Sequence, residues 1–215
     1  MSEKPILFNA EMVKAIIEGR KTVTRRIIKD VKDMDFIGFV SCSVPKGDEG
    51  KAAFGKGSFK DIANAIINKY VRPPYKQGDI LYVRETWFIG DILDEDETIK
   101  DRGVVLYRAD ERREDIDYES IQWKPSIHMP KKYARTYLRV TKVKAERLLV
   151  ITEKDIQREG INEEFPPLAE DEFRKLWDST IKNEDIETYG YKANPWVWVI
   201  EFERIERGNE NNEEI

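Results

Sequence analysis

The sequence predicts an α+β fold, in which a small, mixed and partly closed β-barrel is decorated by three to four helices. About six to eight segments have the alternation or the β-branched and aromatic content of strands, and three or four have helical spacing. Strands and helices do not alternate along the chain as a parallel crossover fold requires, and no glycine-rich phosphate loop follows a strand. A small barrel carrying helices satisfies these observations.

Composition sets the broad class. The chain has 215 residues, of which 40% are hydrophobic and 37% are charged, and this length fits one domain with insertions or one domain with a small appendage. No apolar run reaches the roughly 20 residues of a membrane span, and the first residues lack the apolar core of a signal peptide. The single cysteine, Cys42, rules out an internal disulfide and fits a cytoplasmic location. With one Cys and one His we expect no metal site, and no cofactor.

Charge is distributed unevenly along the chain. The net charge is -5, and residues 206–215 carry four Glu and one Arg, so we expect a polar, acidic and disordered tail. Two stretches, residues 20–29 and 124–139, contain cations and no acids. If the fold brings them together they form a local positive surface. Separate solvated faces are the alternative.

The first half of the chain begins with a strand at residues 5–8 and a helix between Asn9, an N-cap, and Gly19, a C-cap. The segments that follow are predicted as a strand at 22–28, a strand or hairpin at 36–44 inside a surface insertion, and a helix at 59–70. Two prolines, Pro73 and Pro74, end that helix.

The second half is predicted to be richer in strands. We expect strands at 80–87, 104–108, 136–149 and 196–202, and loops at 91–102, 110–120 and 182–192. Thr152 and Asp155 form a capping box, which predicts a short helix ending before Gly160. An amphipathic helix at 168–179 places its aromatic side chains in the core.

Residues 19–26, GRKTVTRR, hold four cations and two hydroxyls without an acid, where the first helix gives way to a strand. A lysine near a threonine, here Lys21 and Thr24, is a possible nucleophile with its base. Cations combined with hydroxyl donors also form an anion-binding surface. The third interpretation is a solvated edge strand protected by its charges.

Two further candidates lie in the second half. Arg84 and Glu85 interrupt a strand and must point to opposite faces, so one is expected to be exposed and the other paired across the sheet. His128, the only histidine, lies in a loop with two prolines. It is either a hydrogen-bonded structural residue or, because Trp123, Lys124 and Ser126 are near it in sequence, a ligand contact.

The stretches GRKTVTRR, KQGDILYVRETW, WKPSIHMPKKYAR, ITEKDIQREGI and ANPWVWVIEFERI together resemble the ASCH domain of the PUA-like superfamily. The resemblance is to the longer bacterial and phage type and runs from about Pro5 to Ile205. It implies a single domain over residues 1–205, with insertions near 30–60 and 90–120, and a basic cleft beside the first helix. Such domains bind RNA or modified nucleosides.

One compact ASCH subfamily is similar in its motif and is an amidohydrolase that removes the acetyl group from N4-acetylcytidine. That similarity implies Thr24 as the nucleophile, Lys21 as its activator and Glu159 as an acid/base. This chain is about twice as long as those enzymes. The residues that we expect to contact nucleic acid or another ligand are Arg20, Arg25, Arg26, Arg84, Glu85, Trp87, Trp123, Lys124, Ser126 and His128.

Three hypotheses about function therefore stand. The favoured one is a module that recognises RNA or a modified nucleoside through its basic cleft. The second is an amidohydrolase that deacylates an N-acylated nucleoside. The third is an accessory protein of a phage or mobile element whose partner is another protein, which an exposed apolar patch would favour.

Overall fold

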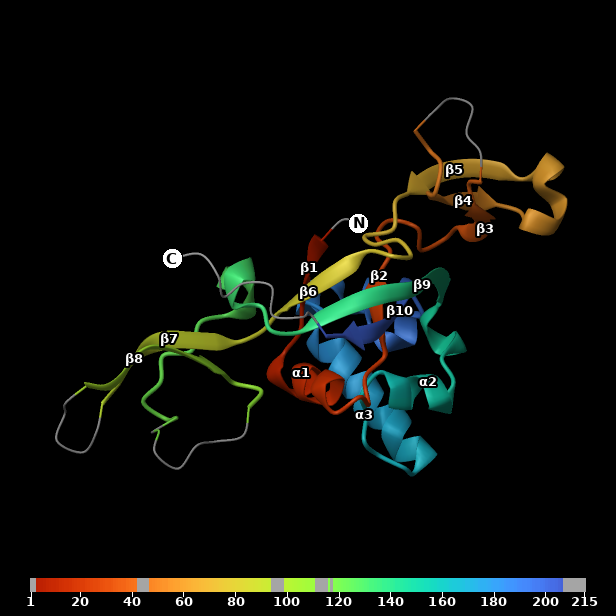
Figure 1. The fold of residues 1–215 in the computed structure, drawn as a ribbon. Coiled ribbons are helices and arrows are strands. Elements are labelled where there is room, and N and C mark those ends of the chain that lie inside the picture. Colours follow the sequence, from red (N-terminus) through yellow and green to blue (C-terminus); the bar gives the residue numbers. More distant parts are fainter. Residues whose placement is uncertain (1–2, 42–46, 94–98, 111–115, 117, 207–215) are drawn as a thin grey trace. The chain divides into compact units, whose positions relative to one another are not determined.

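The computed structural model describes residues 3–41, 47–93, 99–110, 116 and 118–206, and within them the chain is α+β, as predicted (Figure 1). It divides into two compact units, which we describe separately. The first unit comprises Met1–Lys21, Asp79–Arg139 and Glu203–Ile215, and the second comprises Thr22–Gly78 and Val140–Phe202. The residues of strands β9 (Tyr137–Arg147) and β10 (Trp196–Ile205) are divided between the two units.

The first unit is built on three neighbouring strands. Strand β1 (Glu3–Leu7) runs parallel to β6 (Ile80–Arg84), and β6 pairs antiparallel with the first residues of β9. Strands β7 (Trp87–Leu93) and β8 (Ile99–Tyr107) form an antiparallel hairpin. The predicted strand at 80–87 is thus interrupted at Glu85, and the predicted loop at 91–102 belongs largely to the hairpin.

Helix α1 (Ala10–Ile17) begins after the predicted N-cap Asn9, whereas its C-cap is Glu18, one residue before the predicted Gly19. The Asn9 side chain accepts a hydrogen bond from the Met12 backbone N–H at 2.8 Å, which satisfies one of the free donors of the first turn. Just beyond the helix, Gly19 has a φ of +77°, a conformation that glycine adopts at little steric cost. The helix buries Val13, Ala15 and Ile16.

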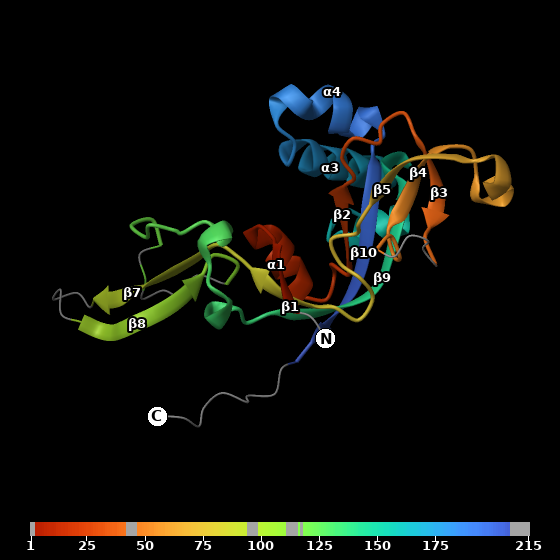
Figure 2. The same cartoon turned by 90° about the horizontal axis from the view of Figure 1, so that it is seen from above.

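The second unit contains a sheet in the order β9-β10-β2, in which β10 pairs antiparallel with β2 (Val23–Ile27). Helices α2 (Glu153–Arg158) and α3 (Pro166–Ser179) contribute buried side chains to its core (Figure 1), and the short helix α4 (Ile186–Tyr189; Figure 2) buries none. The predicted capping box of α2 is present, and α4 occupies part of the predicted loop at 182–192. The buried core cluster is Val23, Leu148, Ile156, Ile161, Ala169, Phe173, Trp177, Tyr191, Val197 and Val199.

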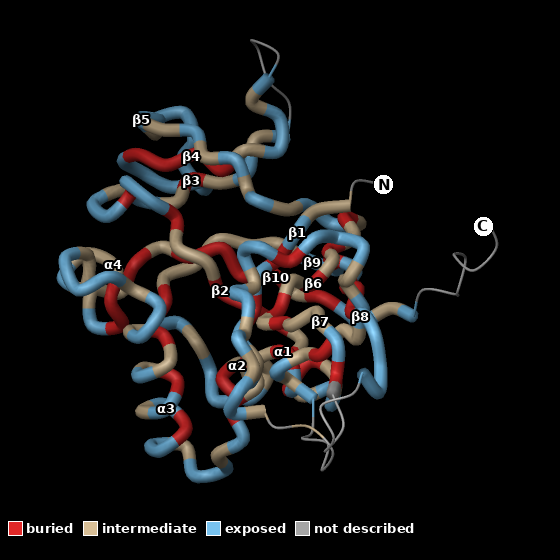
Figure 3. Tube along the Cα trace, turned by 90° about the vertical axis from the view of Figure 1, so that its left-hand side faces the viewer, coloured by how far each residue is buried: buried red, intermediate tan, exposed pale blue. Residues whose placement is uncertain are grey.

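A separate antiparallel sheet in the second unit has the order β3-β4-β5. Its strands are β3 (Asp35–Phe39), β4 (Ala52–Lys56) and β5 (Ile66–Val71). The central strand β4 is buried over most of its length, whereas β5 is largely exposed (Figure 3). The sheet confirms a strand within the predicted insertion.

The predicted helix at 59–70 is wrong. Only a 3-10 helix, η1 (Phe59–Asn64), forms there, and it is broken at Asp61, whose φ of -133° is not helical. Strand β5 follows, because Ile66 and Ile67 are β-branched and pair with β4. Tertiary pairing therefore overrides the helical spacing of the apolar residues.

The described strands form open sheets, and they do not include a closed barrel. No helix among the described residues is long and apolar enough to cross a membrane. Cys42, the predicted tail beyond Glu206 and part of the predicted loop at 110–120 lie outside the described residues.

Candidate functional site

Half of the residues in the basic run at 19–26 are buried. Lys21, Thr24 and Arg25 are only 2%, 3% and 4% exposed, so these residues do not form a solvated edge strand. Arg20, three residues beyond the last residue of α1, donates a hydrogen bond from Nε to the Glu18 carboxylate at 2.8 Å. Burial lowers the pKa of Arg26 from its usual value, although Tyr75 and Glu159 act in the opposite direction.

Arg25 is held by carboxylates from two neighbouring elements of the second unit. Its guanidinium lies 2.9 Å from Glu146 on β9, 3.6 Å from Asp155 on α2 and 3.0 Å from Glu159 at the end of α2. Because a buried guanidinium is costly unless it is paired, this arrangement fixes α2 and β9 against β2. The buried Arg25 Nε has no hydrogen-bond partner among the described residues.

A second arginine extends this network. Arg158 contacts Asp155 at 3.4 Å and Glu201 on β10 at 2.7 Å, and its Nε donates to the Thr22 hydroxyl at 3.3 Å. Partial burial acts to raise the pKa of Asp155, but hydrogen bonds from Thr152 and the charge of Arg25 outweigh it and lower that pKa. The lowered pKa favours the ionised form of Asp155.

The three predicted catalytic residues are divided between the units. Lys21 is the last residue of the first segment of the first unit, and its Nζ lies 5.7 Å from the centroid of the Phe8 ring. Thr24 and Glu159 belong to the second unit, and no hydrogen bond joins the Thr24 hydroxyl to Glu159 in the part of the chain that is described. All three nevertheless belong to the small set of polar side chains that are buried within the described ranges, which are Lys21, Thr24, Arg25, Asp79, Glu85, Thr136 and Glu159.

The first unit contains its own buried charge, Glu85. This side chain is fully buried, and Arg135 donates to its two oxygens from Nε and Nη2, each at 3.0 Å. Arg135 also contacts Asp110 at 2.6 Å and lies over the ring of Tyr107, 3.9 Å from its centroid. Burial raises the pKa of Glu85, and Arg135 counters this only in part. The sequence predicts that one member of the Arg84-Glu85 pair is exposed and the other is paired across the sheet. Glu85 is paired, but with an arginine that lies outside the strands, and Arg84 is only partly exposed.

Burial is also the main reason why the pKa of Tyr107 rises to about 12; Glu85 and Asp110 add to the rise and Arg135 opposes it. The Tyr107 hydroxyl donates to the Tyr133 carbonyl at 2.7 Å. Tyr107 therefore stays protonated and fixes the segment that carries Tyr133.

Lysines and aromatic rings alternate beside this ion pair, and we call Trp87, Lys124, Lys132 and Tyr133 the lysine–aromatic cluster. Lys124 Nζ lies 5.0 Å from the centroid of Trp87, whose ring is 4.9 Å from that of Tyr133, and Lys132 Nζ lies 4.8 Å from Tyr133. Two backbone hydrogen bonds join Trp87 to Lys124 and set their register. The buried Trp87 Nε1 has no hydrogen-bond partner among the described residues.

The other predicted contacts lie along the same segment. Arg84 donates to the Ile127 carbonyl, and Ser126 and His128 are the ends of the 3-10 helix η2 (Ser126–His128). The Trp123 ring stacks on Tyr118 with centroids 6.0 Å apart. The structure therefore brings Arg84, Glu85 and Trp87 close to residues 123–128.

Sequence reasoning missed Tyr107, Asp110 and Tyr133 as members of this region. Tyr133 lies inside the stretch WKPSIHMPKKYAR, one of those that carry the family resemblance, so it could have been included among the candidate ligand contacts. Nothing local marks Tyr107 or Asp110, because their partners are distant in sequence. No group of His, Cys, Asp and Glu in the described ranges could hold a metal ion.

Comparisons with known proteins add little. No protein-family model matches the chain, and no curated protein matches it. Among solved structures, a crystal structure of protein EF3133 from Enterococcus faecalis V583, described with the family label DUF984, has a TM-score of 0.42 and 10% sequence identity. That match covers 100% of this chain and 86% of the other, and the likeness is too low to carry an argument about fold or function.

We expect the change Arg135→Met to lower the free energy of unfolding by about 3 kcal/mol, because it leaves the buried Glu85 without its main partner. The double variant Glu85→Leu with Arg135→Met removes both charges and should recover most of that loss. Urea denaturation measures both. The control is Arg139→Met, whose pair with Glu203 is about half exposed on both sides, where the cost should stay below about 1 kcal/mol. A double variant as unstable as the single one would contradict the expectation.

The stability contributed by Asp155 should depend on pH. Since its pKa is lowered in the folded protein, the contribution is present above the unfolded value of about 3.9 and is lost as the pH falls through the folded pKa. We expect Asp155→Asn to be less stable than the natural protein at neutral pH, and the difference to shrink in acid. Urea denaturation over a pH series measures this, and a difference that does not change with pH would be evidence against it.

Proposed function

We propose that the chain recognises nucleic acid or a modified nucleoside, in the manner of an ASCH domain built on a PUA-like barrel. The observation that carries this proposal is the lysine–aromatic cluster of the first unit. Lys124 and Lys132 are exposed, and each ammonium lies over an aromatic ring rather than against a carboxylate of the described chain. Such lysines are ordered and still able to contact phosphate.

Aromatic rings beside these lysines suit the proposed ligand. Proteins that bind single-stranded nucleic acid combine cations that follow the backbone with rings on which bases stack. Trp123 and Tyr118 are partly exposed and stacked on each other, next to Lys124 in the chain. Residues 118–133 thus supply both kinds of contact.

The cations of the run at residues 19–26 are less available for phosphate. Arg20 is bonded to Glu18, and Arg25 is buried among three carboxylates. Within the proposal, Arg25 supports the fold beside α2, and Lys124 and Lys132 make the phosphate contacts. Arg26, Arg84, Ser126 and His128 remain predicted contacts of the ligand.

The test is binding of a single-stranded RNA oligonucleotide, measured by fluorescence anisotropy over a range of salt concentrations. Each lost phosphate contact should reduce the slope of log K against log salt by about 0.7, so Lys124→Ala with Lys132→Ala should reduce it by about 1.4. The control is Lys154→Ala, an exposed lysine of α2. Binding that ignores salt, or that falls equally in the control, would sink the proposal.

A second candidate is hydrolysis of an acylated nucleoside such as N4-acetylcytidine. The observation in its favour is that Lys21, Thr24 and Glu159 are all buried, although most Lys and Glu side chains are exposed. Buried polar groups are retained where they are hydrogen-bonded, paired or functional. In this mechanism the Thr24 hydroxyl attacks the acyl carbonyl while its proton passes to Lys21, and that proton is relayed through Glu159 to the departing amine. Water then hydrolyses the acyl-Thr24 ester, which releases acetate and restores the hydroxyl.

For this candidate we expect Thr24→Val, which keeps the shape of the side chain, to abolish release of acetate from N4-acetylcytidine without changing RNA binding. Glu159→Gln should do the same, although it also weakens the pair with Arg25. Chromatography of the nucleoside products measures turnover. If the natural protein releases no acetate, or if Thr24→Val turns over normally, this candidate fails while the binding proposal stands.

A further inference from the structure

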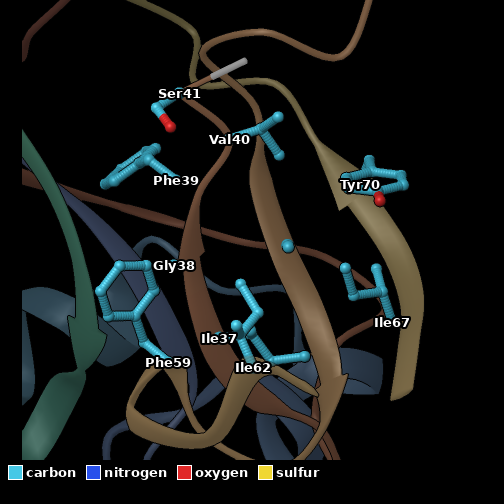
Figure 4. Close-up of a pocket in the computed structure, with 10 residues that line it drawn as sticks. Ile37, Gly38, Phe39, Val40, Ser41, Phe59, Ile62, Ile67 and Tyr70 are labelled. Atoms are coloured by element: carbon cyan, nitrogen blue, oxygen red, sulfur yellow. The ribbon is translucent and has the colours of Figure 1, made fainter. Parts of the chain in front are cut away.

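A hollow of about 250 Å³ lies on one face of the β3-β4-β5 sheet (Figure 4). It is lined almost entirely by apolar side chains, and the residues are Ile37, Gly38, Phe39, Val40, Ser41, Ala53, Phe59, Ile62, Ile67 and Tyr70. Its volume exceeds that of an engineered cavity of about 150 Å³ that binds benzene. The hollow is therefore large enough for one bulky apolar side chain.

Gly38 on β3 allows the Phe59 ring to lie against the strand. Its φ is +151°, and a Cβ there would lie only 2.9 Å from Cδ2 of Phe59, so a larger residue would require that ring to shift. The walls of the hollow are large and exposed: Phe59 and Ile62 on η1 are 67% and 59% exposed, and Tyr70 on β5 is 42% exposed. Contiguous exposed apolar side chains of this kind mark interaction sites.

Beside the hollow, β5 is an edge strand. It pairs with β4 on one side, and no other described strand pairs with it. Exposed edges usually carry charges that prevent pairing, but Ile66, Ile67 and Tyr70 leave much of this edge apolar. An extended peptide can add to such an edge by backbone hydrogen bonds while an adjacent pocket accepts one of its side chains.

The charge around this edge indicates the nature of the occupant. Residues 51–72 contain five cations and one acid, in a protein whose net charge is -5. The acid, Asp61, already accepts hydrogen bonds from the Asn64 side chain at 3.0 and 3.1 Å. Of the five cations, Lys51 and Lys69 are paired with Asp48 and Asp30 at 2.6 and 3.1 Å. The other three, which have no carboxylate partner among the described residues, are Lys56, Lys60 and Arg72. A second copy of this edge would bring like charges together, whereas an acidic segment would complement them.

We infer that β5 and the hollow form a docking site for an extended, acidic segment of a partner protein. The segment adds to β5 as a strand and inserts one apolar side chain between Phe59, Ile62 and Tyr70. Nucleic acid fits less well, because the lining offers only the hydroxyls of Ser41 and Tyr70 as side-chain hydrogen-bonding groups. The site lies in the second unit and does not depend on the lysine–aromatic cluster of the first.

The test uses the full chain and a fluorescein-labelled peptide in which Glu alternates with Val and a central Phe. We expect saturable binding by anisotropy, weakened at least about tenfold by Phe59→Ser, which removes a wall of the hollow. The matched control is Phe165→Ser, which changes a Phe that is 59% exposed outside this sheet and should leave binding unchanged. A peptide with Lys in place of Glu should also bind at least about tenfold more weakly.

Strand addition is tested from the side of the peptide, so that it does not rely on a variant that fails to fold. Two versions of the probe are N-methylated on alternate residues, which blocks the backbone donors of one edge or the other. One version should lose binding and the other should keep it.

Four results would overturn the inference. They are no saturable binding, equal binding of the Glu and Lys peptides, unchanged binding by Phe59→Ser, and equal effects of the two N-methylated probes. If the natural protein forms a dimer and Phe59→Ser dissociates it, the occupant of the hollow is a second copy of the chain. If the peptide fails to bind and Phe59→Ser weakens RNA binding, the occupant is nucleic acid.

Discussion

The buried guanidinium of Arg25 is the constraint on which the second unit depends. It approaches carboxylates of β9, of α2 and of the residue that ends α2, at 2.9, 3.6 and 3.0 Å. A charge removed from water to this extent is tolerated only where opposite charges and hydrogen bonds replace the lost solvation. Since each carboxylate comes from a different position in the chain, the position of α2 beside β2 and β9 is specified electrostatically as well as by apolar packing.

The first unit also buries an ionised side chain that needs an oppositely charged partner, but here the buried charge is negative. Its buried charge is the carboxylate of Glu85, which the Arg135 fork holds with two hydrogen bonds of 3.0 Å. Both buried charges stand in sequence beside a second charge, Arg26 in one case and Arg84 in the other. A dense basic motif therefore does not by itself present a basic surface. Two exposed lysines, Lys124 and Lys132, lie over aromatic rings far along the chain from that motif.

The sequence could predict features that depend on residues close together in the chain, and it could not predict contacts between residues far apart in the chain. The first residues of α1 and α2 were predictable because the Asn9 and Thr152 side chains accept hydrogen bonds from backbone N–H groups three residues away. The strand at β10 was predictable from its own composition. The partners of Arg25 were not, since Glu146 and Glu159 are 121 and 134 residues distant. Such contacts depend on topology, and neither the burial of Arg25 nor the roles of Tyr107 and Asp110 has a local signal.

The wrong prediction at residues 59–70 has a different origin. Ile62, Ile66 and Tyr70 have helical spacing, and a helix there would have buried them along one face. In η1 and β5 the same three side chains are 59%, 61% and 42% exposed. Local pattern and fold usually agree, and where they do not, the discrepancy tends to mark a functional site. These apolar side chains therefore do not pack in the core of this chain. Their exposure agrees with a role in contacting another molecule.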